Sequence, residues 1–98
     1  MDLAELTSEM HRFVASKGWY SPESPRPQTA RNLALSLVVE AAEVAELFQW
    51  SEEPGDRTRL EEELADVSLY LLQLASVSGI DLEKAILAKL KTNYGRAW

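Results

Sequence analysis

VVEAAEVAELFQW, residues 38–50, has the spacing of an amphipathic helix, except that an acid stands at the centre of its apolar stripe. A helix turns by about 100° per residue, so Val44 and Leu47 both fall within about 60° of Glu40. Glu43 lies one turn further along, at the edge of the same stripe. The pattern therefore predicts a helix that directs carboxylates towards its packing partner rather than towards solvent.

A second segment, residues 58–78, repeats this arrangement. Val67 and Leu74 lie within about 60° of Glu63 on a helical projection. Asp66 has the same relation to the stripe as the second acid of the first helix. A single pair of acids at this spacing usually lies on a solvated face. Two pairs on the apolar stripes of neighbouring helices instead favour a shared site.

The connection between these helices is short, because Pro54-Gly55 forms a turn, so the helices are expected to pack antiparallel with their stripes facing. Four carboxylates would then converge, at a high cost in desolvation and mutual repulsion. A divalent cation would remove that cost. The chain has no cysteine and one histidine. Carboxylate ligation therefore predicts a hard ion, Mg²⁺ with Mn²⁺ as a substitute, shared with a phosphate ligand.

Turn-forming residues divide the chain into four predicted helices and no strand, which gives an all-α fold class. Gly18 and Gly79 are the expected stops of the first and third helices. The third helix could begin with a capping box formed by Thr58 and Glu61, or with Asp56 as its cap. The four predicted helices cover residues 2–17, 29–51, 58–78 and 81–93.

The composition narrows the class of partner. Among 98 residues, 10 Lys+Arg stand against 16 Asp+Glu, a formal net charge of −6, which argues against nucleic acid as the main partner. The lack of cysteine favours a cytoplasmic location. The sequence shows neither a signal peptide nor an apolar run long enough to span a bilayer, so no membrane partner is expected. A single domain over residues 1–98 is expected.

Three stretches together resemble a known family. They are RNLALSLVVEAAEVAELFQW (31–50), LEEELADVSLYLLQLA (60–75) and AILAKLKTNYGR (85–96). They resemble the MazG-like nucleotide pyrophosphohydrolases of the all-α NTP pyrophosphatase superfamily, and most of all the small dCTP pyrophosphatase branch. The resemblance implies a four-helix MazG-like fold. It also implies Mg²⁺-dependent hydrolysis of dCTP or a related dNTP to the monophosphate and pyrophosphate, which cleanses the nucleotide pool.

The resemblance also implies roles for individual residues. Metal ligation and catalysis would fall to the four acids, Glu40, Glu43, Glu63 and Asp66. Substrate binding would fall to Trp19, Arg31, Asn32, Trp50, Tyr70, Lys89, Asn93 and His11. Relatives often have a histidine and a proline before the Arg-Asn pair, where this chain has Gln28 and Ala30. The loop at residues 21–27 is also longer than expected, so the base preference stays open.

Apolar residues away from the acids point to self-association. Leu64, Leu69 and Leu72 would be exposed on a monomer. The resemblance favours a homodimer, or a homotetramer built as a dimer of dimers, in which helices from two chains form a bundle and share active-site residues. Two other functions stay open: a non-catalytic helical oligomerisation module, and a dNTP-sensing protein that binds without hydrolysis.

Overall fold

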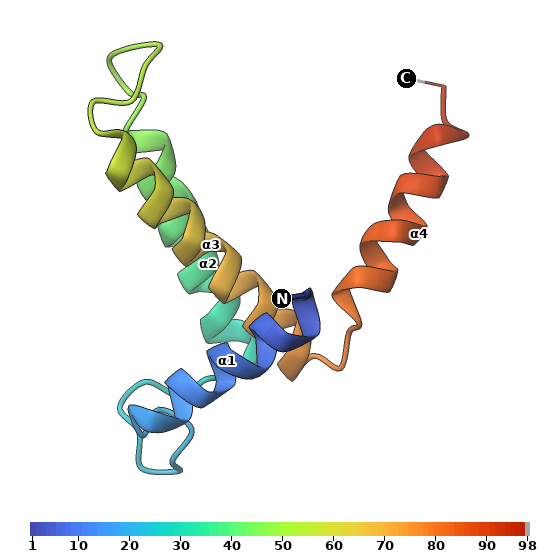
Figure 1. Cartoon of the computed structure of the whole chain (residues 1–98). Coiled ribbons are helices and arrows are strands. Elements are labelled where there is room, and N and C mark those ends of the chain that lie inside the picture. Colours follow the sequence, from blue (N-terminus) through green and yellow to red (C-terminus); the bar gives the residue numbers. More distant parts are fainter. Residues whose placement is uncertain (98) are drawn as a thin grey trace.

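The computed structural model describes residues 1–97 and contains four α-helices, with no strand among those residues. The helices are α1 (Leu3–Ser16), α2 (Ala30–Glu46), α3 (Arg57–Val77) and α4 (Leu82–Tyr94), shown in Figure 1. The predicted all-α class is therefore confirmed. Among the described residues, no helix has the length and apolar character needed to span a membrane.

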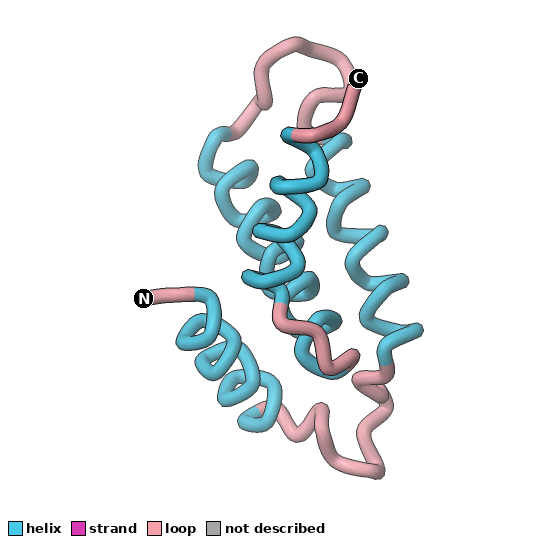
Figure 2. Tube along the Cα trace, turned by 90° about the vertical axis from the view of Figure 1, so that its right-hand side faces the viewer, coloured by secondary structure: helices cyan, strands magenta, loops and turns pink. Residues whose placement is uncertain are grey.

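The helices α2 and α3 form the central pair, and α1 packs against α3 (Figures 1 and 2). The pair is antiparallel, because the short connection at 47–56 returns the chain alongside itself. The small buried core lies where α1 meets this pair, around Leu33, which is 1% exposed. The other buried apolar side chains are Met10, Val14, Leu72 and Ala75. The expectation that Leu72 is exposed on a monomer is wrong, because α1 packs against α3, whereas Leu64 and Leu69 are exposed as expected.

The helix termini follow local chemistry, with one correction to the sequence-based bounds. Asp56 caps α3 by accepting hydrogen bonds from the backbone of Thr58 and Arg59, so the alternative capping box is not the one used. The sequence pattern extends the second helix to residue 51, but α2 ends at Glu46. Beyond that point, the Leu47 nitrogen donates to a carbonyl three residues back, which tightens the chain into turns.

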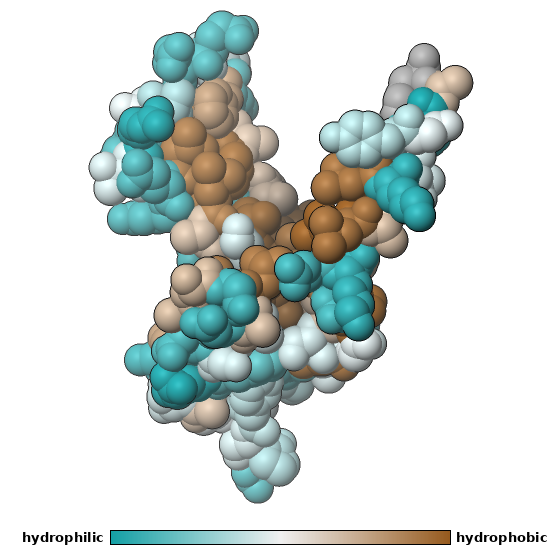
Figure 3. All heavy atoms as spheres, turned by 45° about the vertical axis from the view of Figure 1, so that its right-hand side comes forward, coloured by the Kyte–Doolittle hydropathy of each residue, from teal (hydrophilic) through white to brown (hydrophobic). Residues whose placement is uncertain are grey.

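The helix α4 leaves the rest of the molecule and packs mainly against the end of α3 (Figure 1). Its residues Ile86, Leu87 and Leu90 are exposed, and Figure 3 shows apolar surface both on α4 and on the helix pair. The Cα radius of gyration is 15.8 Å, whereas a compact domain of this length would have about 13 Å. The single chain is thus more open than a closed helical bundle.

Candidate functional site

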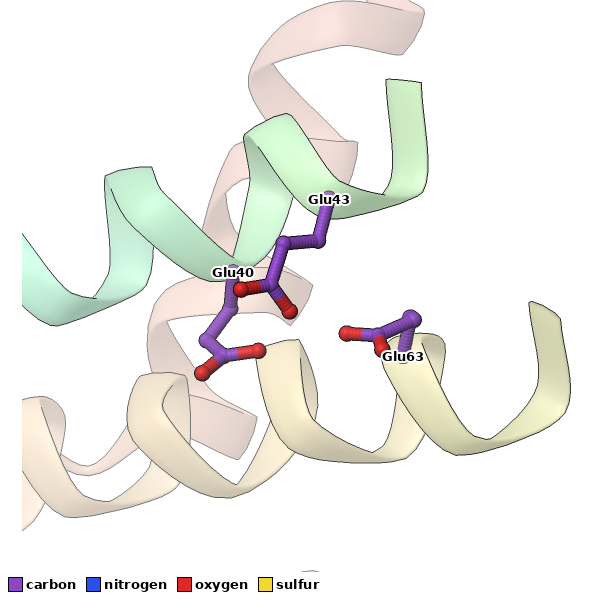
Figure 4. A group of neighbouring side chains, drawn as sticks. All are labelled: Glu40, Glu43 and Glu63. Carbon is purple, nitrogen blue, oxygen red and sulfur yellow. The ribbon is translucent and has the colours of Figure 1, made fainter. Parts of the chain in front are cut away.

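Three glutamates converge between α2 and α3. Glu40 and Glu43 come from α2 and Glu63 from α3, and their side chains point into the space between the two helices (Figure 4). One carboxylate oxygen from each residue lies within 4.8 Å of those of the other two. The arrangement follows from the sequence, because all three acids stand on the stripes along which the two helices pack.

The carboxylates lack the partners that buried acids need. Glu63 is only 8% exposed. Within residues 1–97, buried Oε2 atoms of Glu40 and Glu63 have no hydrogen-bond partner. Among residues 1–97, the one ion pair with this group joins Arg59 Nη2 to Glu63 Oε1 at 3.4 Å, and the Arg59 side chain is more than half exposed. Orphaned anionic oxygens facing one another fit a cation site, and the donor set is all oxygen.

Without a cation, protons must compensate part of this charge. Hydrogen bonds with Glu63, and then with Glu40, raise the pKa of Glu43 to about 7, and the charges of both neighbours add to the effect. The pKa of Glu40 is also raised, chiefly because burial penalises its charged form, with the charges of Asp66 and Glu63 contributing. A proton shared between carboxylates thus takes the place of a divalent cation.

This proton makes the stability of the metal-free protein depend on pH. Folded Glu43 keeps its proton up to about pH 7, whereas the unfolded residue releases it near its ordinary pKa of 4.5. Glu43 therefore favours the folded state most at low pH, and this contribution is lost as the pH rises from 4.5 through 7. We expect the melting temperature in a metal chelator to decline more steeply across this window in the native chain than in Glu43→Gln. Equal slopes in the two proteins would contradict this assignment.

Asp66, the fourth predicted acid, lies beside the three glutamates rather than among them. It is exposed on α3 and does not belong to the group that converges within 4.8 Å. Its charge nevertheless acts on Glu40, and both residues line one cavity next to the acids. Asp66 therefore stands at the border between the acidic group and that cavity.

The cavity beside the acids has a volume of about 410 Å³ and a largely apolar wall. Trp19 and Tyr70 line it, and both also line a second cavity of about 400 Å³ that includes Asn32. Aromatic walls next to an acidic group suit a ligand with a flat, stackable part and a charged part. Two of the predicted aromatic residues are thus placed beside the acids.

His11 is half-buried and is hydrogen-bonded through both of its ring nitrogens. Nδ1 is hydrogen-bonded to the hydroxyl of Tyr20, and Nε2 lies 2.7 Å from the Ser76 hydroxyl. These bonds join α1 to the loop that follows it and to the end of α3. In this structure His11 supports the wall of the site rather than lining the cavity beside the acids.

The other predicted substrate-binding residues lie away from the acids in the single chain. Arg31 is on the first turn of α2, nine residues and about 13 Å along the axis from Glu40. Trp50 follows the end of α2 and is 89% exposed. Lys89 and Asn93 are on α4, which stands apart from the helix pair (Figure 1). This chain alone does not bring the α4 residues to the acids.

Three polar residues lie at this site although the sequence pattern does not single them out as binding residues. They are Gln73, Tyr20 and Gln28. Gln73 is buried, lines the cavity beside the acids, and hydrogen-bonds to Tyr20 and Gln28. The sequence does hold a signal for Gln73, because it follows Asp66 by seven residues and so lies on the same side of α3. No local pattern shows that loop residues 20 and 28 would meet it.

Comparisons with known proteins show which family this chain is similar to. A family model described as MazG-like matches residues 35–97. The dCTP pyrophosphatase 1 of Bos taurus is 41% identical over 97% of this chain, and that of Homo sapiens 40% identical over the same share. The chain spans just over half of each, 57% and 56%.

Two further proteins are similar over more of their own length. A dATP/dGTP diphosphohydrolase of Cyanophage S-2L is 32% identical, with 98% of this chain and 77% of the phage protein aligned. Among solved structures, a pyrophosphatase from Archaeoglobus fulgidus superposes with a TM-score of 0.77 and 34% identity. That superposition covers 92% of this chain and 86% of the archaeal one.

Proposed function

This chain belongs to the MazG-like family, and on that premise we propose that it hydrolyses a deoxynucleoside triphosphate to the monophosphate and pyrophosphate with the help of Mg²⁺. The observation that carries the proposal is the group of Glu40, Glu43 and Glu63, with buried oxygens lacking a partner, beside an aromatic cavity. Related proteins named as dCTP pyrophosphatases and as a dATP/dGTP diphosphohydrolase support the same reaction class. The names of these relatives offer two candidate base preferences, cytosine on the one hand and adenine or guanine on the other.

The metal would be held by the three glutamates, with Asp66 as the fourth acid at the edge of the group. An oxygen-only donor set fits Mg²⁺, with Mn²⁺ as a substitute. The bound cation would neutralise the negative charge of the triphosphate and the charge that develops during its hydrolysis. Without a cation, four carboxylates would repel the polyanionic substrate.

The side chains around the metal would orient the substrate. Trp19 and Tyr70 line the cavity and would stack against the base, which keeps water from that part of the site. A carboxylate of the acidic group would accept a proton from the water that attacks the α-phosphorus. These roles place phosphate chemistry between α2 and α3, and base recognition between α1, its loop and α3.

We also propose that the active form is a homodimer or a dimer of dimers. Lys89 and Asn93 sit on α4, which stands away from the acids and has exposed apolar residues along it. A second copy packed against α4 would cover that surface and bring phosphate-binding side chains to a neighbouring acidic group. In this arrangement, helices of two chains complete one bundle.

The direct test is pyrophosphate release from each of the four dNTPs, with Mg²⁺ and with a chelator. We expect Mg²⁺-dependent release of pyrophosphate, strongest with one base, and with the monophosphate as the other product. Release of inorganic phosphate instead would place the cut at another bond and contradict the proposal. Thermal stabilisation by Mg²⁺ and nucleotide without any hydrolysis would show a dNTP-sensing protein. No response to either would indicate an oligomerisation module.

A further inference from the structure

Gln73 is the most deeply buried polar residue of the described chain. Its side chain is 3% exposed on the inner face of α3, and it lines the cavity beside the acids. A primary amide in this position is costly unless its hydrogen-bonding groups are used. Which of its two ends faces the cavity decides what kind of ligand it can recognise.

A chain of hydrogen bonds fixes the orientation of this amide. Gln28 Nε2 donates to the backbone carbonyl of Arg26, at 2.6 Å. A carbonyl can only accept, so the Gln28 amide nitrogen must face it and the Gln28 oxygen must face the other way. That oxygen lies 2.8 Å from Gln73 Nε2. The backbone of the loop therefore determines which end of Gln73 is the donor.

Tyr20 supplies the second constraint. Gln73 Nε2 also donates to the Tyr20 hydroxyl, at 3.2 Å. That hydroxyl can direct its own hydrogen to His11 Nδ1, and His11 Nε2 can then donate to the Ser76 hydroxyl. The bonds run in one consistent direction from α3 through α1. Both amide hydrogens of Gln73 are thereby engaged with protein groups.

The remaining polar atom is the Gln73 carbonyl oxygen. Within residues 1–97, Oε1 accepts no hydrogen bond, and protein atoms do not enclose it completely. It is thus available to a donor in the cavity that Gln73 lines. A site that presents a fixed acceptor takes a donor well and rejects a second acceptor.

The distance between Gln73 and the acids matches the distance between the base and the phosphates of a nucleotide. Gln73 lies seven residues after Asp66 on α3, which is two turns and about 10 Å along the axis. Tyr70 lies between them, and all three residues line the same cavity. A nucleotide with its phosphates at the acids would extend its base past Tyr70, and the far edge of that base would meet Gln73.

We propose that Gln73, oriented by Gln28 and Tyr20, is a specificity-determining residue that selects bases with an exocyclic amine, cytosine or adenine, over uracil and thymine. The inference rests on the proposed nucleotide function. The 4-amino group of cytosine donates to Gln73 Oε1, whereas the 4-oxygen of uracil would face it as a second acceptor. A uracil base would leave both its 4-oxygen and Gln73 Oε1 without a donor, and this should lower its affinity roughly 10- to 100-fold relative to cytosine.

The test compares two ligands that differ at this edge. Binding of non-hydrolysable α,β-imido analogues of dCTP and dUTP is measured with Mg²⁺ present, for the native chain and for Gln73→Met. We expect the native chain to favour the cytosine analogue by about 10- to 100-fold, and Gln73→Met to lose most of that preference. Gln49→Met, at an exposed position past the end of α2, is the matched control and should keep it.

A second variant guards against a folding defect in Gln73→Met. Gln28→Met removes the acceptor that orients Gln73, so the amide can turn and offer a donor, and binding of the uracil analogue should improve. Retention of the native preference in both variants would overturn the inference, as would equal binding of the two analogues by the native chain. A chain that binds with this preference but releases no pyrophosphate would contradict the proposed hydrolysis and leave the role of Gln73 supported. Failure of both analogues to bind would overturn both.

Discussion

Glu43→Gln is expected to lower Mg²⁺-dependent hydrolysis at least about 100-fold while leaving the fold intact. The substitution keeps the size of the side chain but removes one charge from a group whose oxygens converge within 4.8 Å. Metal affinity and charge compensation on the phosphates should both fall. In a chelator the variant should melt at a temperature no lower than that of the native chain, because repulsion with Glu40 and Glu63 is relieved. Turnover and thermal unfolding, measured with and without Mg²⁺, check this.

Glu46→Gln is the matched control, because Glu46 is an exposed acid three residues further along α2. It also removes one negative charge, so any general effect of net charge should appear in both variants. We expect turnover within about twofold of the native value for Glu46→Gln. Equal losses of turnover in the two variants, or full activity of Glu43→Gln, would contradict a role for the acidic group in the reaction.

Leu87→Asp is expected to separate the oligomer into monomers and to abolish turnover at low protein concentration. Leu87 is 60% exposed in the single chain and lies on α4 beside other exposed apolar residues. If a second copy covers it, a carboxylate there would be buried against apolar groups, which should weaken association at least about 100-fold. Light scattering and turnover, measured over a range of protein concentrations, would follow both effects.

The control for this surface is Thr92→Asp. Thr92 lies five residues after Leu87 and therefore about 140° around α4. It introduces the same charge on the other side of the helix and should leave the mass unchanged. Turnover is not compared for this control, because position 92 lies one turn from Lys89. A native chain that is already monomeric and active would contradict the proposal that α4 residues complete the site of a neighbouring copy.

The helical architecture could be predicted because it rests on local signals. Apolar spacing and turn residues give four helices, and Asp2, Thr29, Asp56 and Asp81 supply side-chain caps at their starts. The acids that converge are also visible in the spacing, since a charge inside an apolar stripe is costly unless something compensates it. The pattern places the end of α2 too late, because Leu47 and Phe48 continue the apolar spacing after the backbone has turned.

The wall of the cavity could not be predicted in the same way. Gln73 meets Tyr20 and Gln28 across 53 and 45 residues of sequence, and nothing in the local pattern of any of them encodes that contact. The direction of α4 is a second case, because its exposed apolar residues predict burial but not the surface that buries them. Contacts between elements, and between chains, depend on geometry that periodicity does not carry.

The acids lie on two packed helices, whereas Trp19, Tyr20 and Gln28 come from the segment between α1 and α2. Under the proposed function, the side chains that orient Gln73 therefore come from a different segment than the acids, although Gln73 itself lies on α3 with Glu63 and Asp66. If the proposal holds, changes of length or composition in residues 18–29 would alter the orientation of Gln73, and with it the base that is accepted, while the acidic group keeps its support. The base preference could then shift through this loop alone, without any change in the acids on α2 and α3.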